Sequence, residues 1–239
     1  MDRAVSRSFD ILECLARARQ PSRLSDIAAE TGLQKSTVHR ILGTLCALGH
    51  ARQDETGRYG PTLRAWELGA GVVTSMPIYR VAAGFLQALH RTTAETVSLT
   101  ILSGDDVVYL EKIVAARPVR FYTRVGSRAP APLTASGKAM LAFRPDARSV
   151  VERVAAVSNL DVPALMTELS QVRQRGYALS GYSPGVTSIG AAVAAGGAPP
   201  DAALSISAPT ERLTARKRDA LIEALLETRA RMTEALDQR

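Results

Sequence analysis

The sequence predicts an α+β protein with a helical N-terminal unit, a linker helix and a C-terminal antiparallel sheet flanked by helices. In the first third of the chain, apolar residues recur every three to four positions, which is the spacing of an amphipathic helix. Beyond residue 95, short apolar runs bounded by Gly, Asp and Pro turns indicate strands. With 239 residues, the chain is long enough for two modest domains. We expect the boundaries 1–61, 62–76 and 77–239.

Composition narrows the class of protein. The apolar share of 46% and the charged share of 22% are ordinary for a folded chain. No run of 18 apolar residues is present and the N-terminus lacks the apolar core of a signal peptide, so we expect a cytoplasmic protein with no membrane partner. Cys14 and Cys46 lie among apolar residues at helical spacing and are expected to be buried thiols. The net charge of +7 is by itself weak support for a nucleic-acid partner.

Three helices are expected in the N-terminal unit, over 3–19, 26–31 and 34–48. Ser25 fits the N-cap of the second helix, because its hydroxyl can accept a hydrogen bond from a free backbone N–H. Gly32 ends that helix, because glycine takes the left-handed conformation at little cost.

The second and third helices have the spacing of a helix-turn-helix. Ala28, Gly32, Val38 and Ile41 occupy positions where the two helices cross closely, so each must be small, turn-forming or apolar. An arbitrary helical hairpin can match this pattern by chance. The polar turn at 54–57, between two short extended pieces, predicts a hairpin in the position of a wing. Together these features predict a winged helix-turn-helix, which binds DNA.

The N-terminal end of the third helix is expected to enter the major groove of DNA. Ser36 and Thr37 can donate to phosphate, Gln34 can read adenine and Arg40 can read guanine. The alternative to a DNA contact is that His39 is an ordinary exposed helix residue. For each arginine of the wing, the alternative is a solvated side chain on the hairpin. The residues expected at DNA are Gln34, Lys35, Ser36, Thr37, His39 and Arg40 on the helix, and Arg52 and Arg58 at the wing.

The rest of the chain alternates between helical and extended patterns. Pro77 suits the first turn of a helix, and the Gly- and Pro-rich stretch 196–201 predicts a turn between the last two strands. We expect helices at 62–73, from 77, at 135–143, 146–156 and 162–175 and after 210, and strands at 96–103, 107–113, 119–125, 177–179, 187–195 and 202–207.

The segment 134–141, TASGKAML, contains a serine, a glycine and a lysine that could belong to an enzyme. It is not a phosphate-binding loop, because that loop needs glycine where Pro132 stands and Ser or Thr where Ala139 stands. It does not fit a Ser-x-x-Lys nucleophile pair either, because Ser136 and Lys138 are only two residues apart.

The segment 181–185, GYSPG, fits the G-x-S-x-G pattern of a hydrolase nucleophile. The oxyanion hole of that site needs the N–H of the residue after the serine, and Pro184 has none. All three histidines precede this segment, whereas the hydrolase needs one downstream. Because H-E-x-x-H, C-x-x-C and clustered carboxylate motifs are also missing from the sequence, we expect no catalytic residue, no metal and no cofactor.

The order of motifs along the chain is specific. It runs from LSDIAAETGLQKSTVHRILGTL through the wing and PTLRAWELG to RVGSRAPAPLTASGKAML, GVTSIGAAV and ALSISAP. This series, which covers nearly the whole chain, resembles the IclR family of bacterial transcription regulators. The resemblance implies a winged helix-turn-helix, a linker helix and a GAF-like domain that binds a small molecule. It also implies a dimer through the DNA domains, often doubled to a tetramer.

The resemblance places an effector pocket between the sheet and the loops around it. A helix N-terminus suits a carboxylate, and alternate residues of a strand point to one face. Serines that satisfy backbone groups in a tight core are the alternative. Tyr182 lies near the position where the family usually carries an acidic residue. The pocket residues expected from the resemblance and from their neighbourhood in sequence are Val119, Phe121, Ala135, Ser136, Tyr182, Ser188, Ser205 and Ser207.

Basic residues near this pocket in the sequence can attract an anionic effector, with a solvated strand face as the alternative. Lys138 is expected to face solvent one turn into its helix. The basic residues are Lys112, Arg117, Arg120, Arg124, Arg128 and Lys138.

We therefore expect a transcription regulator, repressor or activator, whose operator binding is changed by a small organic acid through the linker helix. Its partners would be double-stranded operator DNA, the acid, and further copies of the chain in a homodimer or tetramer. Two alternatives stay open. One is a small-molecule hydrolase or transferase with an accessory DNA-binding domain. The other is a DNA-binding protein without a ligand, whose C-terminal domain only assembles oligomers.

Overall fold

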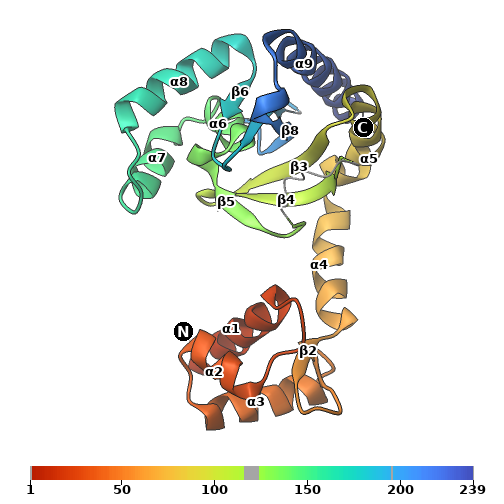
Figure 1. Ribbon diagram of the computed structural model, residues 1–239, viewed down its shortest axis with the longest axis vertical. Coiled ribbons are helices and arrows are strands. Elements are labelled where there is room, and N and C mark those ends of the chain that lie inside the picture. The colour runs from red at the N-terminus through yellow and green to blue at the C-terminus, as the bar shows by residue number, and fades with distance from the viewer. Residues whose placement is uncertain (1, 116–123, 195, 239) are drawn as a thin grey trace. The chain divides into compact units, whose positions relative to one another are not determined.

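The computed structural model describes residues 2–115, 124–194 and 196–238 of the chain (Figure 1). It contains two compact units, Met1–Ser75 and Met76–Arg239, each with its own hydrophobic core. Within the described residues, no single helix is long and apolar enough to cross a membrane. Cys14 is buried, Cys46 is partly buried, and both are free thiols.

The first unit is a winged helix-turn-helix, as predicted. Its elements are α1 (Arg3–Arg17), α2 (Leu24–Thr31), α3 (Lys35–Ala47), β1 (Ala51–Gln53), β2 (Tyr59–Pro61) and α4 (Leu63–Ser75). The first three helices pack around Ile11, Leu15, Ile27 and Leu42, none of which is more than 1% exposed. Gly32 makes the turn between α2 and α3 in the left-handed conformation, with φ of 68°. Strands β1 and β2 pair antiparallel and form the wing.

The start of α2 differs from the prediction. The helix begins at Leu24, two residues earlier than expected, and its N-cap is Arg23, which makes no capping hydrogen bond with its side chain. Ser25 therefore lies inside the helix, and its hydroxyl donates to the carboxylate of Asp26. The apolar side chain of Leu24 packs against the core of the unit, which accounts for the extra helical residues.

The second unit is built on one antiparallel sheet. Its strands are β3 (Thr96–Ser103), β4 (Asp106–Ile113), β5 (Arg128–Pro130), β6 (Ala178–Ser180), β7 (Val186–Val193) and β8 (Ala202–Pro209). They are hydrogen-bonded in the order β5-β4-β3-β8-β7-β6. The central β3–β8 pair joins distant parts of the chain, with Val97 opposite Ile206.

Helices cover both faces of this sheet. They are α5 (Pro77–Thr93), α6 (Ala135–Leu141), α7 (Ala147–Ala155), α8 (Val162–Arg175) and α9 (Ala215–Asp237), with 3-10 turns η1 (Ala131–Leu133) and η2 (Thr210–Arg212). Helices α5 and α9 pack on one face, whereas α6 lies on the other with α7 and α8 outside it (Figure 1). This arrangement confirms the predicted α+β class with helices flanking an antiparallel sheet.

The expected strand at 119–125 lies mostly outside the residues that the structure describes. Residues 116–123 lie outside the described residues, and Arg124 and Val125 are not in a strand. Among the described residues, the next strand after β4 is β5, whose residue Ala129 lies opposite Val107. It is only three residues long and ends at Pro130, which has no N–H to continue the ladder.

Two glycines allow α6 to lie very close to its neighbours. A Cβ placed on Gly137 would lie 2.1 Å from the carbonyl oxygen of Ala131. A Cβ placed on Gly190 of β7 would lie 2.5 Å from the carbonyl carbon of Ala135. Since both contacts are with backbone atoms, only glycine fits at either position. Gly137 therefore lets α6 lie against η1, and Gly190 lets the start of α6 lie against the sheet, where the pocket described below is formed.

Candidate functional site

The N-terminal half of α3 presents a polar surface. Its apolar residues Val38 and Ile41 point into the core and are at most 4% exposed. The N-cap Gln34 makes no capping hydrogen bond with its side chain, so the first N–H groups of the helix are not satisfied from there. All six residues that were expected at DNA on this helix lie on the surface. Gln34, Lys35, Ser36, His39 and Arg40 are exposed and Thr37 is partly exposed.

The wing is held in shape by Asp54. Its Oδ1 atom accepts hydrogen bonds from the Thr56 amide at 2.9 Å, the Thr56 hydroxyl at 2.7 Å and the Arg58 amide at 2.9 Å. The bond from the Thr56 side chain is the main reason why the pKa of the Asp54 carboxyl lies below its usual range. Arg52 is exposed on β1 and Arg58 is partly exposed at the end of the turn. The hairpin thus carries both wing arginines of the prediction at the surface.

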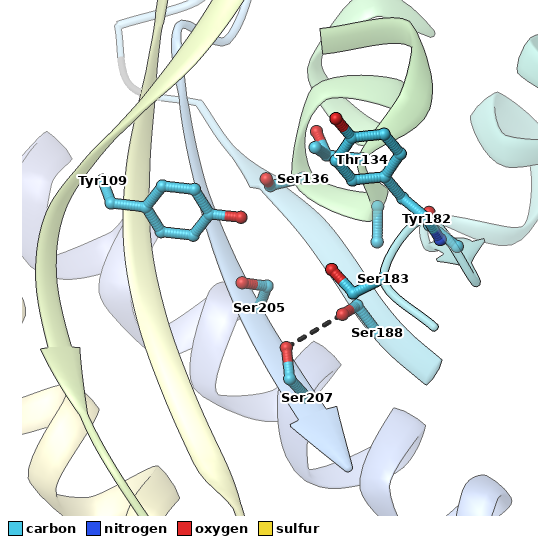
Figure 2. A pocket seen from close by; sticks show the side chains of 10 residues that line it. Tyr109, Thr134, Ser136, Tyr182, Ser183, Ser188, Ser205 and Ser207 are labelled. Atoms are coloured by element: carbon cyan, nitrogen blue, oxygen red, sulfur yellow. Dashed lines mark hydrogen bonds between the residues drawn. The ribbon is translucent and has the colours of Figure 1, made fainter. Parts of the chain in front are cut away.

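The second unit contains a cavity with ten lining residues, nine of which carry a hydroxyl group (Figure 2). It encloses about 310 Å³ of empty space, its open mouth included. Five separate segments converge on it: β4, the start of α6, β6 with the loop that follows, β7 and β8. We call it the hydroxyl pocket. Its lining residues are Tyr109, Thr134, Ala135, Ser136, Ser180, Tyr182, Ser183, Ser188, Ser205 and Ser207.

Strands β7 and β8 form the floor of the hydroxyl pocket. Ser188 lies opposite Ser207 in the register, and their Oγ atoms are 2.9 Å apart. Ser205, two residues before Ser207, points to the same face of the sheet. Gly190 lies opposite Ser205 and carries no side chain, which leaves room for the start of α6. All three serines line the hydroxyl pocket, and the hydroxyls of Ser188 and Ser207 are hydrogen-bonded to each other.

The first turn of α6 closes one side of the hydroxyl pocket. Thr134 is the N-cap, and its hydroxyl accepts a hydrogen bond of 3.1 Å from the Gly137 amide. Ala135 and Ser136 follow as the first helical residues, and both are buried. Ser180 braces the opposite loop: its hydroxyl donates to the Leu133 carbonyl at 2.5 Å and accepts from the Tyr182 amide at 3.1 Å.

Two tyrosines border the hydroxyl pocket. The ring of Tyr109 comes from β4 and directs its hydroxyl into the cavity (Figure 2). Burial, and secondarily the nearby Tyr182, raises the pKa of the Tyr109 phenol, so this group stays protonated at neutral pH. Tyr182 lies on the loop after β6 and is 51% exposed. A buried and an exposed tyrosine thus face the same cavity.

The structure brings together six of the eight residues expected at the effector pocket, namely Ala135, Ser136, Tyr182, Ser188, Ser205 and Ser207. The other two, Val119 and Phe121, lie outside the described residues. Sequence reasoning missed Tyr109, Thr134, Ser180 and Ser183. Ser183 belongs to GYSPG and was weighed only as a nucleophile. Thr134 could have been found as the Ser/Thr N-cap that precedes a helix.

Of the basic residues expected beside the pocket, Lys138 and Arg128 form ion pairs with residues outside its lining. Lys138 is wrongly predicted to face solvent: its side chain is 14% exposed, and Nζ lies 2.8 Å from Oε2 of Glu168 on α8. Arg128 pairs with Asp106 at 3.0 Å. Burial lowers the pKa of Lys112 to about 8. The lining of the hydroxyl pocket includes neither these residues nor Arg124, and Arg117 and Arg120 lie outside the described part of the chain.

The site lacks the partners that a serine hydrolase requires. Ser183 lines the hydroxyl pocket, but none of His39, His50 and His90 does. Pro184, which follows the serine, has no N–H to offer an oxyanion. Among the described residues, no group of three or more His, Cys, Asp or Glu side chains could hold a metal ion. The chemistry that the pocket can perform is therefore hydrogen bonding to a polar ligand.

Comparisons with known proteins identify the family. The model described as bacterial transcriptional regulator IclR C-terminal matches residues 70–233, and the IclR helix-turn-helix domain matches residues 4–55. The HTH-type transcriptional regulator KdgR of Escherichia coli (strain K12) is 32% identical over 242 residues, covering 97% of this chain and 91% of that protein.

Solved structures agree over the full length. A crystal structure of an IclR transcriptional regulator from Alicyclobacillus acidocaldarius has a TM-score of 0.83 and 26% identity, and covers 99% of both chains. An IclR homolog from Microbacterium hydrocarbonoxydans, complexed with 4-hydroxybenzoate, has a TM-score of 0.85 at 24% identity, with 99% of this chain and 100% of that chain covered. The second likeness shows the fold alone. The chain belongs to the IclR family of transcriptional regulators, with an N-terminal helix-turn-helix domain and a C-terminal effector-binding domain.

Proposed function

We propose that this regulator binds a two-fold operator as a homodimer in the cytoplasm, and that a small organic acid in the hydroxyl pocket changes its affinity for that operator. The observation that carries the proposal is the hydroxyl pocket itself, where five segments place polar side chains around one cavity. Such a group of hydroxyls suits a polar ligand, because a buried polar group needs a hydrogen-bond partner.

The DNA-binding part of the proposal rests on α3 and the wing. Six expected residues are surface-accessible on α3, from Gln34 to Arg40, and the wing carries Arg52 and Arg58. The helix would enter the major groove with its N-terminal residues at the base edges, and the arginines of the wing would hold phosphates. In a homodimer, the two recognition helices would lie about 34 Å apart, one turn of DNA.

The homodimer is supported by the surface of the linker helix α4. Although α4 is rich in apolar residues, none of them is buried within the chain. Leu63 is 76% exposed and Trp66 is 68% exposed. An apolar surface of this kind marks an interaction site, and a second copy of the same helix would cover it. We propose that α4 pairs the chains and transmits the state of the effector domain to the DNA-binding unit.

The class of effector follows from the lining of the hydroxyl pocket. Hydroxyl groups donate to and accept from a ligand, so they can hold both the carboxylate and the hydroxyl or oxo groups of a short organic acid. The neutral Tyr109 phenol adds a donor on the β4 side.

Two measurements test the proposal. In a thermal-shift screen of short hydroxy and oxo acids, an acid that binds should raise the unfolding temperature of the wild-type protein. The same acid should raise the unfolding temperature of Ser205→Ala by less. DNA that the purified protein selects from a random library should have two-fold symmetry. The affinity of the protein for this DNA, measured by fluorescence anisotropy, should change when the same acid is added. If no acid of a broad panel binds, the second unit is an oligomerisation domain without a ligand. If an acid or ester is turned over, the protein is an enzyme.

A further inference from the structure

The segment just before α2 is hydrogen-bonded to the wing. Ser22 and Tyr59 of β2 are antiparallel partners, and the amide of each donates to the carbonyl of the other at 2.8 Å. On its other side, Tyr59 is paired with Gln53 of β1. The segment at Ser22 therefore lies along the free edge of β2, so the start of α2 and the wing are parts of one small sheet.

This pairing places Arg23 opposite Arg58. In an antiparallel pair, the residue after one partner lies opposite the residue before the other, and the backbone of Arg23 is still extended. The same register puts Pro21 opposite Gly60, and the Cγ atom of Pro21 is 3.9 Å from the position of a Cβ on Gly60. Tyr59 is 6% exposed and packs in the core, so the alternating side chains of both arginines point outward.

Neither of these guanidinium groups is neutralised by a carboxylate. Among the residues that the structure describes, Arg23 and Arg58 form no ion pair. Asp26, in the first turn of α2, accepts a hydrogen bond from the Ser25 hydroxyl instead. Asp54 is engaged in the turn of the wing, and attraction to Arg58 is the weakest of the interactions that lower its pKa. Two like charges that lie opposite each other weaken a sheet.

Arg23 is also unfavourable for α2. It is the N-cap of the helix, and its side chain makes no capping hydrogen bond. A cation at this end meets the positive end of the helix dipole, and Ser, Thr, Asp or Asn would cap the helix better. Arg23 therefore weakens both the helix and the sheet edge. Residues that break local rules in this way are expected at functional sites.

We propose that Arg23 and Arg58 hold one backbone phosphate of the operator between them, so that Arg23 anchors the start of α2 on the DNA. The inference rests on the proposed binding of DNA by α3 and the wing, and adds an anchor outside both. In a helix-turn-helix the first helix crosses the DNA backbone, and α2 is that helix here. A phosphate can accept from both guanidinium groups and removes the repulsion between them. A backbone contact positions the protein without reading sequence.

The test measures DNA affinity and stability on the full-length protein. Fluorescence anisotropy would use a DNA site selected from a random library and a scrambled duplex. We expect Arg23→Ser to weaken binding to both by a similar factor, roughly tenfold, because a charge-assisted hydrogen bond is lost. The midpoint of urea unfolding should not fall, because serine is the better N-cap. Arg17→Ser is the matched control: it removes a positive charge from the same unit, but Arg17 pairs with Glu13 and Glu30, so both affinities should stay nearly unchanged.

The double variant Arg23→Ser/Arg58→Ser tests whether the two arginines share one phosphate. If they do, the slope of log K against log salt concentration should become less steep by ~0.9, the value of one phosphate contact. The loss of affinity should then be smaller than the product of the two single losses. A slope change of about two contacts, with losses that multiply, would assign the arginines to separate phosphates and overturn the shared site.

The remaining outcomes separate the inference from the proposed function. If Arg23→Ser binds both DNAs as tightly as the wild-type protein, Arg23 is no anchor and the inference is overturned. A loss confined to the selected site would assign Arg23 to a base, and a loss of affinity together with a lower urea midpoint would assign it a structural role; each overturns the inference. If the wild-type protein binds no DNA, the proposed function itself is contradicted.

Discussion

Gly190 of β7 lies directly against Ala135 at the start of α6. A Cβ on Gly190 would come within 2.6 Å of both the Ala135 carbonyl oxygen and the Ser136 amide nitrogen. The close approach sets the distance between the floor of the hydroxyl pocket and the helix that closes it. Gly190 therefore shapes the pocket without lining it.

Gly190→Ala should destabilise the second unit, because the added methyl group meets backbone atoms that cannot turn aside. We expect a loss of about 1–3 kcal/mol in the free energy of unfolding, measured by urea denaturation. Gly84→Ala is the control: its Cβ would meet nothing within 4 Å, and it lies inside α5. There alanine should stabilise by up to about 1 kcal/mol. Equal effects of the two substitutions would contradict the close packing.

The ion pair between Lys138 and Glu168 should hold α6 against α8. Their side chains are 14% and 30% exposed, and the charged atoms lie 2.8 Å apart. A double-mutant cycle with Lys138→Met and Glu168→Gln should give a coupling energy of about 1–2 kcal/mol in urea denaturation. The exposed pair Arg148–Glu152 on α7, 62% and 54% exposed, should give less than about 0.5 kcal/mol. If the coupling energy of Lys138–Glu168 is no larger than that of Arg148–Glu152, partial burial does not strengthen the ion pair.

Local signals explain why the sequence predicted several elements correctly. Helix α8 was expected at 162–175 and spans Val162–Arg175. Asp161 caps it by accepting from the Ala164 amide at 2.9 Å, and Gly176 ends it with φ of 82°. Both residues are neighbours of the helix, so their effect can be read without tertiary structure.

The missed site features depend on long-range pairing. Tyr109 reaches the hydroxyl pocket because β4 pairs with β3, and β3 pairs with β8. This strand order cannot be predicted from the local sequence of any one strand. Lys138 appeared solvent-exposed because its partner Glu168 is thirty residues away and approaches only when α8 packs. Ser205 and Ser207 could be placed on one face because strand alternation is local.

Arg40→Ala should weaken specific DNA binding by about 1–3 kcal/mol if the side chain reads a base. Arg40 is exposed near the N-terminal end of α3, where base contacts are made in a helix-turn-helix. Fluorescence anisotropy with a selected operator and with scrambled DNA would measure both affinities. An equal loss on both DNAs would assign Arg40 to phosphate instead. Arg148→Ala, on α7 of the second unit, controls for the loss of one positive charge and should leave specificity unchanged.

The wing should lose order in acid. Hydrogen bonds hold the pKa of Asp54 below its usual value of 3.8. The charged carboxylate therefore stabilises the folded wing above that value, and this contribution is lost as the pH falls through the lowered pKa. Amide exchange of Thr56 and Arg58, followed by NMR from pH 6 downward, should accelerate at the acid end beyond the intrinsic pH trend. In Asp54→Asn the acid-dependent change should disappear; its persistence would mean that another group controls the wing.

Trp66→Ser should separate the proposed homodimer into monomers. The indole of Trp66 is 68% exposed on α4, and buried aromatic residues dominate the energy of protein interfaces. We expect the dimer dissociation constant, from sedimentation velocity, to rise by roughly tenfold or more. The helical content should stay constant, because no residue of α4 is buried within the chain. Glu67→Ser, an exposed neighbour on the same helix, should leave the constant nearly unchanged. A dimer that resists Trp66→Ser but not Glu67→Ser would place the interface on the other side of α4.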